Sequence, residues 1–79
     1  MISPWNFPVN LSFGPLAAIF AAGNQVMHKP SELTPITAKL IKDLCDKSYD
    51  EHEFATFLGG PEVGEAFTKL HFDHLLYTG

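Results

Sequence analysis

Short β-like runs alternate along the chain with stretches of helical periodicity, and glycine or proline separates one from the next. The β-like runs that can be located are residues 25–29, 54–58 and 75–77. Strands that alternate with helices of this length are typical of right-handed crossovers and a parallel sheet. Such a sheet buries both of its faces against helices. The sequence therefore predicts an α/β fold with four short strands and three helices.

Three segments show the apolar spacing of helices. Pro15 opens the first, residues 16–22, and Gly23-Asn24 ends it in the way of a left-handed cap. Thr34 and Pro35 open the second as N-cap and first helical residue, and it runs to residue 47. The third, residues 63–70, follows a Gly-Gly-Pro turn. The expected buried faces are Leu16, Ile19 and Phe20 in the first helix, Ile36, Leu40, Ile41, Leu44 and Cys45 in the second, and Val63, Ala66, Phe67 and Leu70 in the third.

Composition narrows the possible classes of function. The chain has 79 residues, 46 % of them hydrophobic, which suits one small packed unit. Its formal net charge is −4, which argues against a nucleic-acid surface. No apolar stretch approaches the roughly 20 residues of a membrane-spanning helix, and a single cysteine fits a reducing compartment. We therefore expect a cytoplasmic chain that forms part of a larger domain and that can self-associate through a bare sheet edge.

Four local patterns carry candidate chemistry. The first presents Trp5 and Asn6 from backbone that two prolines hold rigid. The second places Lys29 and Glu32 just after a strand, where ligands of open parallel sheets bind. The four patterns are Ser3-Pro4-Trp5-Asn6-Phe7-Pro8, Gly23-Asn24 followed by Lys29-Pro30-Ser31-Glu32, Gly59-Gly60-Pro61-Glu62-Val63-Gly64, and Tyr77-Thr78-Gly79.

In this order and spacing the four patterns resemble the aldehyde dehydrogenase superfamily over essentially the whole chain. The Pro-Trp-Asn-Phe-Pro and Lys-Pro-Ser-Glu elements are specific, whereas the glycine-rich turn is a weak signal alone. That turn and Phe72-Asp73-His74 look like the branch of coniferyl-aldehyde and related aromatic or long-chain aldehyde dehydrogenases. The resemblance implies a partial Rossmann-like parallel sheet with flanking helices, and residues 1–79 as part of an NAD(P)-binding domain.

The resemblance also implies roles for single residues. Asn6 matches the asparagine whose amide donates to the oxyanion formed when a cysteine thiolate attacks the aldehyde. Trp5 matches the residue whose indole N–H approaches the cofactor pyrophosphate. Lys29 and Glu32 match the pair that holds the adenine ribose hydroxyls. Cofactor contacts are further implied at three glycines of the turn, of which the last two match positions where adenine packs: Gly59, Gly60 and Gly64.

The cofactor implied by the resemblance is NAD or NADP. The Glu32 carboxylate accepts hydrogen bonds from a free 2′-hydroxyl and repels a 2′-phosphate, so NAD is favoured, while Lys29 nearby leaves NADP open. The partners of an intact enzyme would be this cofactor and an aldehyde. The catalytic cysteine, the general-base glutamate and the oligomerisation segment are expected outside these residues. The isolated chain is therefore expected to be inactive.

Plainer interpretations exist for several of these residues. Cys45 on an apolar helix face is typical of an inert buried thiol rather than a nucleophile. His71 and His74 lack a third ligand, so no metal site is expected. Asn6 alone would be a turn residue, and Lys29 with Glu32 a surface ion pair worth under about 1 kcal/mol. As a whole, the chain could instead be a non-catalytic nucleotide-binding or self-associating α/β fragment.

Overall fold

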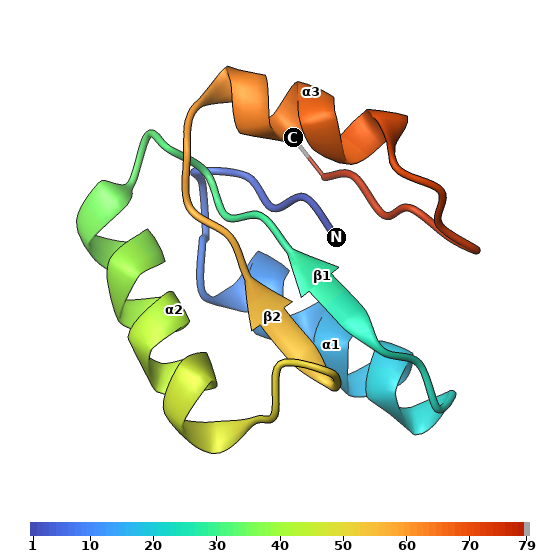
Figure 1. Cartoon of the computed structure of the whole chain (residues 1–79). Coiled ribbons are helices and arrows are strands. Elements are labelled where there is room, and N and C mark those ends of the chain that lie inside the picture. The colour runs from blue at the N-terminus through green and yellow to red at the C-terminus, as the bar shows by residue number, and fades with distance from the viewer. Residues whose placement is uncertain (79) are drawn as a thin grey trace.

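A computed structural model describes residues 1–78 of the chain and shows helices alternating with short strands (Figure 1). The elements are α1 (Asn10–Ala21), β1 (Val26–His28), α2 (Pro35–Ser48), β2 (Phe54–Thr56) and α3 (Pro61–Lys69). The α/β class expected from the alternation is confirmed. No helix in the described part of the chain is long and apolar enough to cross a bilayer.

The sheet is parallel throughout. Strand β1 pairs with β2 in the register Val26↔Phe54, Met27↔Ala55 and His28↔Thr56. Two isolated parallel bridges, Ile2↔Lys29 and Ile2↔Tyr77, extend the sheet on the other side of β1. The order across the sheet is therefore β2, β1, Ile2 and Tyr77, which in chain order is 3-2-1-4. This is the order at the centre of a doubly wound Rossmann-type sheet.

The last β-like run is shorter than the sequence suggests. Of residues 75–77, only Tyr77 pairs, through its bridge to Ile2. Backbone hydrogen bonds from Ile2 N–H to Leu76 O (2.8 Å) and from Thr78 N–H to Ile2 O (3.2 Å) make this contact. The prediction of a strand over 75–77 was therefore wrong in extent. Gly79, which ends the fourth sequence pattern, lies outside the described residues.

The first helix begins six residues before the predicted start at Leu16, so Pro15 lies inside it rather than at its first position. A proline within a helix removes one backbone hydrogen bond and crowds the residue before it. Here that preceding residue is Gly14, which brings no Cβ against the proline ring, so one of the clashes of a proline inside a helix is avoided. Helix α1 runs through Pro15.

The second helix begins as predicted, with Thr34 at the N-cap and Pro35 at the first position. Its buried face was predicted only in part. Ile41 and Cys45 are buried together with Ala38, whereas three apolar side chains assigned to that face are exposed: Ile36, Leu40 and Leu44. A helix that packs mainly on one short strand buries a narrow stripe at i, i+3 and i+7, which leaves the neighbouring i, i+4, i+8 row uncovered.

Helices α1 and α2 share one core with the sheet. In Figure 1, α1 lies behind the strands and α2 lies beside β2. Leu16 of α1, Ile41 and Cys45 of α2, and Val26 and Phe54 of the strands belong to this core. Helix α3 contributes a single buried residue, Phe67, whose ring lies 5.7 Å from that of Phe57 and 6.2 Å from that of Phe72. The predicted apolar stripe of the third helix is otherwise exposed or half-buried.

Candidate functional site

A cleft of about 790 Å³ opens beyond the carboxyl ends of Ile2, β1 and Tyr77. Ile2 pairs with Lys29, just after β1, on one side and with Tyr77 on the other. The strands that follow Ile2 in the chain therefore lie on both sides of it, first β1 and β2 and then Tyr77. Open α/β sheets bind ligands at such a switch point, outside the carboxyl ends of the strands. The volume also lies within the roughly 300–1,000 Å³ of small-molecule sites.

The cleft brings together five of the seven residues that the sequence singled out. They are Trp5, Asn6, Lys29, Glu32 and Gly64. Lys29 and Glu32 lie more than twenty positions from Trp5 and Asn6 in the chain, and Gly64 lies more than thirty positions further on. Both pairs therefore lie on the rim of one cleft, although they are far apart in the chain.

Trp5 and Asn6 lie on the segment that leaves the sheet after Ser3. Both side chains are exposed, Trp5 to 58 %. The next residue, Phe7, has a φ of +50°, and it is the one non-glycine residue with positive φ among residues 1–78. This conformation costs of the order of 1–2 kcal/mol for an L-residue and turns the chain sharply after Asn6. No local signal predicts it, since a residue before proline normally prefers an extended backbone.

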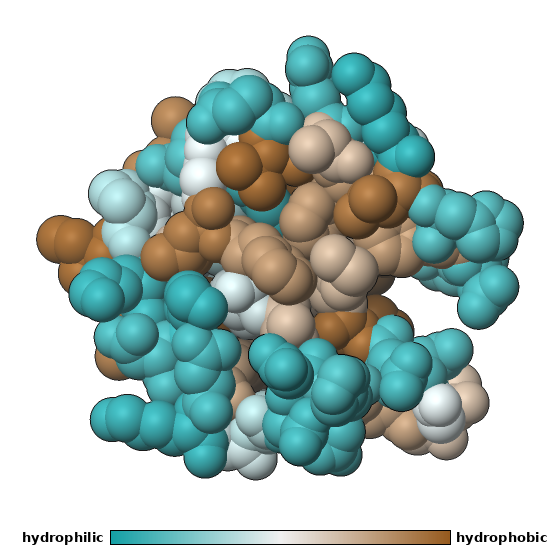
Figure 2. All heavy atoms as spheres, in the orientation of Figure 1, coloured by the Kyte–Doolittle hydropathy of each residue, from teal (hydrophilic) through white to brown (hydrophobic). Residues whose placement is uncertain are grey.

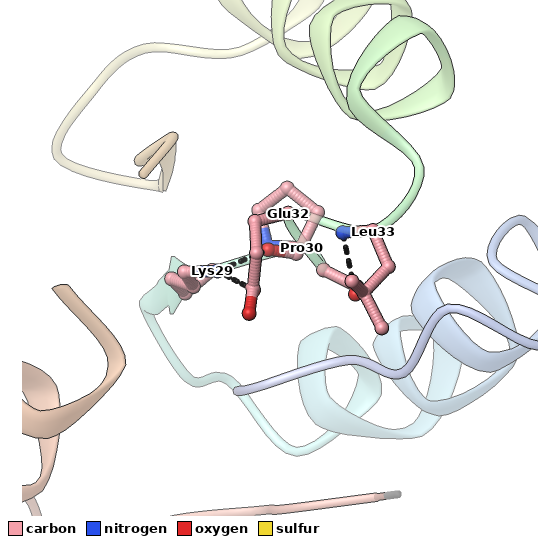
Figure 3. A network of polar contacts seen from close by, with 5 residues as sticks. Lys29, Pro30, Glu32 and Leu33 are labelled. Atoms are coloured by element: carbon pink, nitrogen blue, oxygen red, sulfur yellow. Dashed lines mark hydrogen bonds and ion pairs between the residues drawn. The ribbon is translucent and has the colours of Figure 1, made fainter. Parts of the chain in front are cut away.

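Lys29 is buried, with its side chain 3 % exposed, although it ends at the cleft. Its ammonium donates to the Pro30 carbonyl at 2.7 Å and to the Glu32 carboxylate at 3.0 Å (Figure 3). An ammonium has three N–H donors, so one remains for a ligand after these two bonds. The interpretation of Lys29 and Glu32 as a surface ion pair is therefore wrong for Lys29, whose side chain is buried, whereas Glu32 is exposed.

The carboxylate of Glu32 stays accessible, at 37 % exposure. Its pKa is lowered, first by a hydrogen bond from its own backbone amide and then by the hydrogen bond from Lys29. It is therefore ionised at neutral pH and can accept hydrogen bonds from the cleft. The hydroxyl oxygen of Ser31, which lies between Lys29 and Glu32 in the chain, accepts a hydrogen bond from Leu33 N–H at 3.1 Å. This bond closes the turn that carries Glu32 (Figure 3).

One face of α3 forms the opposite wall. Pro61, Gly64, Glu65 and Thr68 line the cleft at the spacing i, i+3, i+4 and i+7. Glu65 and Thr68 were not identified from the sequence, although helical spacing from Gly64 would have found them. Thr68 donates its hydroxyl to the Glu65 carbonyl at 2.7 Å. A Cβ built at Gly64 meets no atom within 4 Å, so this position faces open space in which a ligand can approach the helix backbone.

Gly59 and Gly60 do not line the cleft. Gly59 has a φ of +151°, and a Cβ built there would collide with the Val63 side chain. At Gly60, the N-cap of α3, an added Cβ would approach a Glu62 carboxylate oxygen to 2.7 Å. The positive φ and the contact with Val63 explain Gly59 by the turn itself, whereas the atom near Gly60 is the end of a flexible side chain, so the turn does not require glycine there. Contact of either glycine with a cofactor stays a prediction.

The chemistry of the cleft is that of polar recognition. Its charged side chains within residues 1–78 are Lys29, Glu32 and Glu65. The single cysteine, Cys45, lies elsewhere in the core at 1 % exposure, and burial raises the pKa of its thiol. Nowhere in the described chain do three His, Cys, Asp or Glu side chains converge as metal ligands. The nitrogen donors that the cleft offers are the Trp5 indole, the Asn6 amide and the Lys29 ammonium, and serine, threonine and tyrosine hydroxyls line it as well.

Comparisons with known proteins show the family to which the sequence is similar. The family model described as "Aldehyde dehydrogenase family" matches residues 1–79. A probable coniferyl aldehyde dehydrogenase of Caulobacter vibrioides is 62 % identical over the whole chain, and a coniferyl aldehyde dehydrogenase of a Pseudomonas species is 58 % identical. Aldehyde dehydrogenase family 3 member B1 of Bos taurus is 42 % identical. The chain spans 16–17 % of the length of these relatives.

Proposed function

Because the chain belongs to the aldehyde dehydrogenase family, we propose that it forms one side of the nicotinamide-cofactor cleft of an enzyme that oxidises an aldehyde to a carboxylic acid. The observation that carries this proposal is the cleft at the switch point of the sheet, where Trp5, Asn6, Lys29 and Glu32 meet. Residues 1–79 are then part of the cofactor-binding domain of a cytoplasmic enzyme. Coniferyl aldehyde, named in the bacterial relatives, is the first substrate to test.

Lys29 and Glu32 suit the recognition of a ribose. The carboxylate of Glu32 accepts from vicinal hydroxyls, and the remaining N–H of Lys29 donates to one of the same oxygens. Because Lys29 is already held by Pro30 and Glu32, little side-chain entropy is lost when the ligand binds. The open position at Gly64 leaves room for a flat base against α3. These residues fit a dinucleotide, whose nicotinamide accepts the hydride in the reaction.

NAD is favoured over NADP by the charges of the cleft. The two carboxylates, Glu32 and Glu65, outnumber the one ammonium, Lys29, so the charged groups that line it sum to −1. A 2′-phosphate placed beside Glu32 would face a carboxylate held ionised by its lowered pKa. Lys29 is engaged with that same carboxylate, which limits what it offers to a phosphate.

Asn6 serves the chemical step in this proposal. Its side-chain amide is exposed at the cleft and donates to the aldehyde oxygen as negative charge develops there. A donor fixed before the reaction stabilises the transition state more than the ground state, because the charge is absent from the free aldehyde. The thiolate nucleophile and the general base come from parts of the enzyme outside residues 1–79.

A segment exchange tests the proposal. This chain replaces the matching segment of the Caulobacter vibrioides relative, and oxidation of coniferyl aldehyde is followed by NADH absorbance. In that enzyme Asn6→Ala should lower kcat by about 10²–10³-fold. Glu32→Gln keeps an acceptor for Lys29 but should raise the KM for NAD and lower the preference for NAD over NADP. The control Glu51→Gln, at an exposed loop position, should change neither constant. Full activity in the Asn6→Ala enzyme would contradict the assignment.

Self-association of the chain is a second candidate, and it rests on exposed apolar surface. The row of Ile36, Leu40 and Leu44 on α2 is 54–86 % exposed, and Phe57 and Leu58 beyond β2 are each about 40 % exposed. Figure 2 shows apolar side chains gathered in the middle of one face, with hydrophilic residues around them. Sedimentation velocity of the chain at increasing concentration tests self-association. A monomer at every concentration would eliminate this candidate function.

A further inference from the structure

A buried hydrogen bond joins the two halves of the cleft rim. Ser3 Oγ lies 2.9 Å from His28 Nε2, and the two residues are 25 positions apart in the chain. Ser3 is 4 % exposed and His28 is fully buried. Neither the sequence patterns nor the roles proposed above use His28. Burying two polar groups costs desolvation free energy, which their hydrogen bond offsets only in part. The parts of the molecule that this bond joins therefore bear on its role.

The position of the pair relates directly to the site. Ser3 directly follows the bridge residue Ile2 and lies two positions before Trp5, and His28 directly precedes Lys29. The backbones meet at the same level, where Ser3 N–H donates to Lys29 O at 3.1 Å and Lys29 N–H donates to Met1 O at 2.9 Å. Beyond Ser3 the chain leaves the sheet. The side-chain bond therefore lies at the point where both rim segments leave their strands.

The imidazole of His28 is neutral at physiological pH. Its pKa is lowered to about 4, mainly by burial and further by the positive charges of the chain's amino group and of Lys29. Nδ1 has no hydrogen-bond partner within the described residues. A hydrogen bond between Nε2 and Ser3 Oγ forms with either neutral tautomer, because the serine hydroxyl can both donate and accept. With a neutral ring, the bond adds no charge beside Lys29.

We propose that Ser3 and His28 are positioning residues, whose hydrogen bond holds the Trp5–Asn6 segment in register with Lys29 and Glu32 across the cleft. The inference rests on the function proposed above. Without the bond, the segment after Ser3 is free to move relative to β1, and the Asn6 amide shifts from the place where charge develops. A displacement of about 1 Å can lower a rate by about 10²-fold. The pair acts through Asn6, and neither member contacts the reacting atoms.

The test uses the exchanged enzyme described above, with NAD and coniferyl aldehyde. Ser3→Ala removes a single oxygen atom, and His28→Leu removes the imidazole at similar bulk. Each should lower kcat by about 10–100-fold, and the double variant should lose no more than the worse single one, because both remove the same bond. His28→Gln should recover most of the rate, since its amide can donate to Ser3 Oγ or accept from it. Recovery by a hydrogen-bonding side chain of different shape is not expected of a residue that only fills space.

Thr56→Val is the matched control. Thr56 is as buried as His28, pairs with it in the sheet, and lies outside the cleft. Its hydroxyl has no hydrogen-bond partner among residues 1–78, so an isosteric change tests general damage to the core. It should leave kcat unchanged. If Ser3→Ala keeps the kcat of the parent while Asn6→Ala loses it, the positioning role is refuted and the proposed function stands. If Asn6→Ala loses nothing, the proposed function fails first. Should His28→Leu not fold, Ser3→Ala alone decides.

Discussion

Burial of His28 makes the stability of the chain depend on pH in a defined window. In the folded chain the pKa of His28 is about 4, against 6.5 for an unperturbed histidine. Between these two values the unfolded chain binds a proton that the folded chain does not. The free energy of unfolding therefore rises with pH across this range. The contribution is complete above pH 6.5 and is lost progressively as the pH falls towards 4.

The size of the effect follows from the gap of about 2.5 pH units. Each unit corresponds to about 1.36 kcal/mol, so neutral His28 contributes about 3 kcal/mol at pH 7 relative to pH 4. Domains of this size are stable by only several kcal/mol in total. Acidification to pH 4 should therefore unfold a measurable fraction of the chain without denaturant. The positive charges that face the ring, on the amino group of Met1 and on Lys29, oppose its protonation.

The assay is urea unfolding of the 79-residue chain at half-unit steps between pH 4 and pH 7.5, followed by circular dichroism. The variant His28→Gln cannot titrate at this position, so the difference between its pH profile and that of the parent isolates the contribution of one residue. The lowered pKa of Glu32 acts at more acidic pH, below its ordinary value of 4.5, and is common to both chains. Parallel profiles for the two chains, with no extra loss in the parent below pH 6.5, would refute the reasoning.

Three further outcomes are expected from the packing. Phe54→Ala, at 1 % exposure in the shared core, should lower the free energy of unfolding by about 3–5 kcal/mol, whereas Ile36→Ala, at 86 % exposure, should change it by less than about 0.5 kcal/mol in the same urea titration. Gly64→Ala should raise that free energy by about 0.5–1 kcal/mol, because the helix has space for the methyl group. The same change should raise the KM for NAD in the exchanged enzyme. Gly59→Ala should lower the free energy of unfolding, since its backbone is strained for alanine and the methyl group meets Val63. The thiol of Cys45, buried and with a raised pKa, should react with a disulfide reagent many-fold more slowly in the native chain than in urea, and equal rates would place it outside the core.

Local patterns predicted the parts of the site that depend on neighbouring residues. Lys29 and Glu32 are three positions apart in a turn, so their contact needs no long-range information. The cleft itself was predictable from topology, since parallel strands place their carboxyl ends at one edge. The bond between Ser3 and His28 was not predictable in this way. It depends on the register of two segments 25 positions apart, and a one-residue slip of either would turn its side chain to the other face of the sheet, away from its partner.

The errors in the helices have a different origin. Proline usually opens a helix, but α1 runs through Pro15, where the preceding Gly14 avoids one of the clashes of a proline inside a helix. In α2 the apolar residues cover more than one face, and the pattern does not say which row the sheet will cover. One apolar row of α2 stays exposed to solvent, namely Ile36, Leu40 and Leu44. The spacing of apolar residues thus predicts that a helix is amphipathic, but not which of its apolar residues are buried. Burial depends on what lies opposite, and in residues 1–78 only part of α2 has a strand opposite it.

The sheet explains why four separated sequence patterns form one site. Each of them follows or surrounds a strand end, and Ile2 pairs with both Lys29 and Tyr77, so a single residue joins the two sides of the switch point. Backbone hydrogen bonds on both sides of Ile2 thus place the segments that carry Trp5, Asn6, Lys29 and Glu32, and the side chains of these segments are free to be polar. The buried side-chain bond between Ser3 and His28 lies beside Ile2 and adds a further restraint to this backbone pairing.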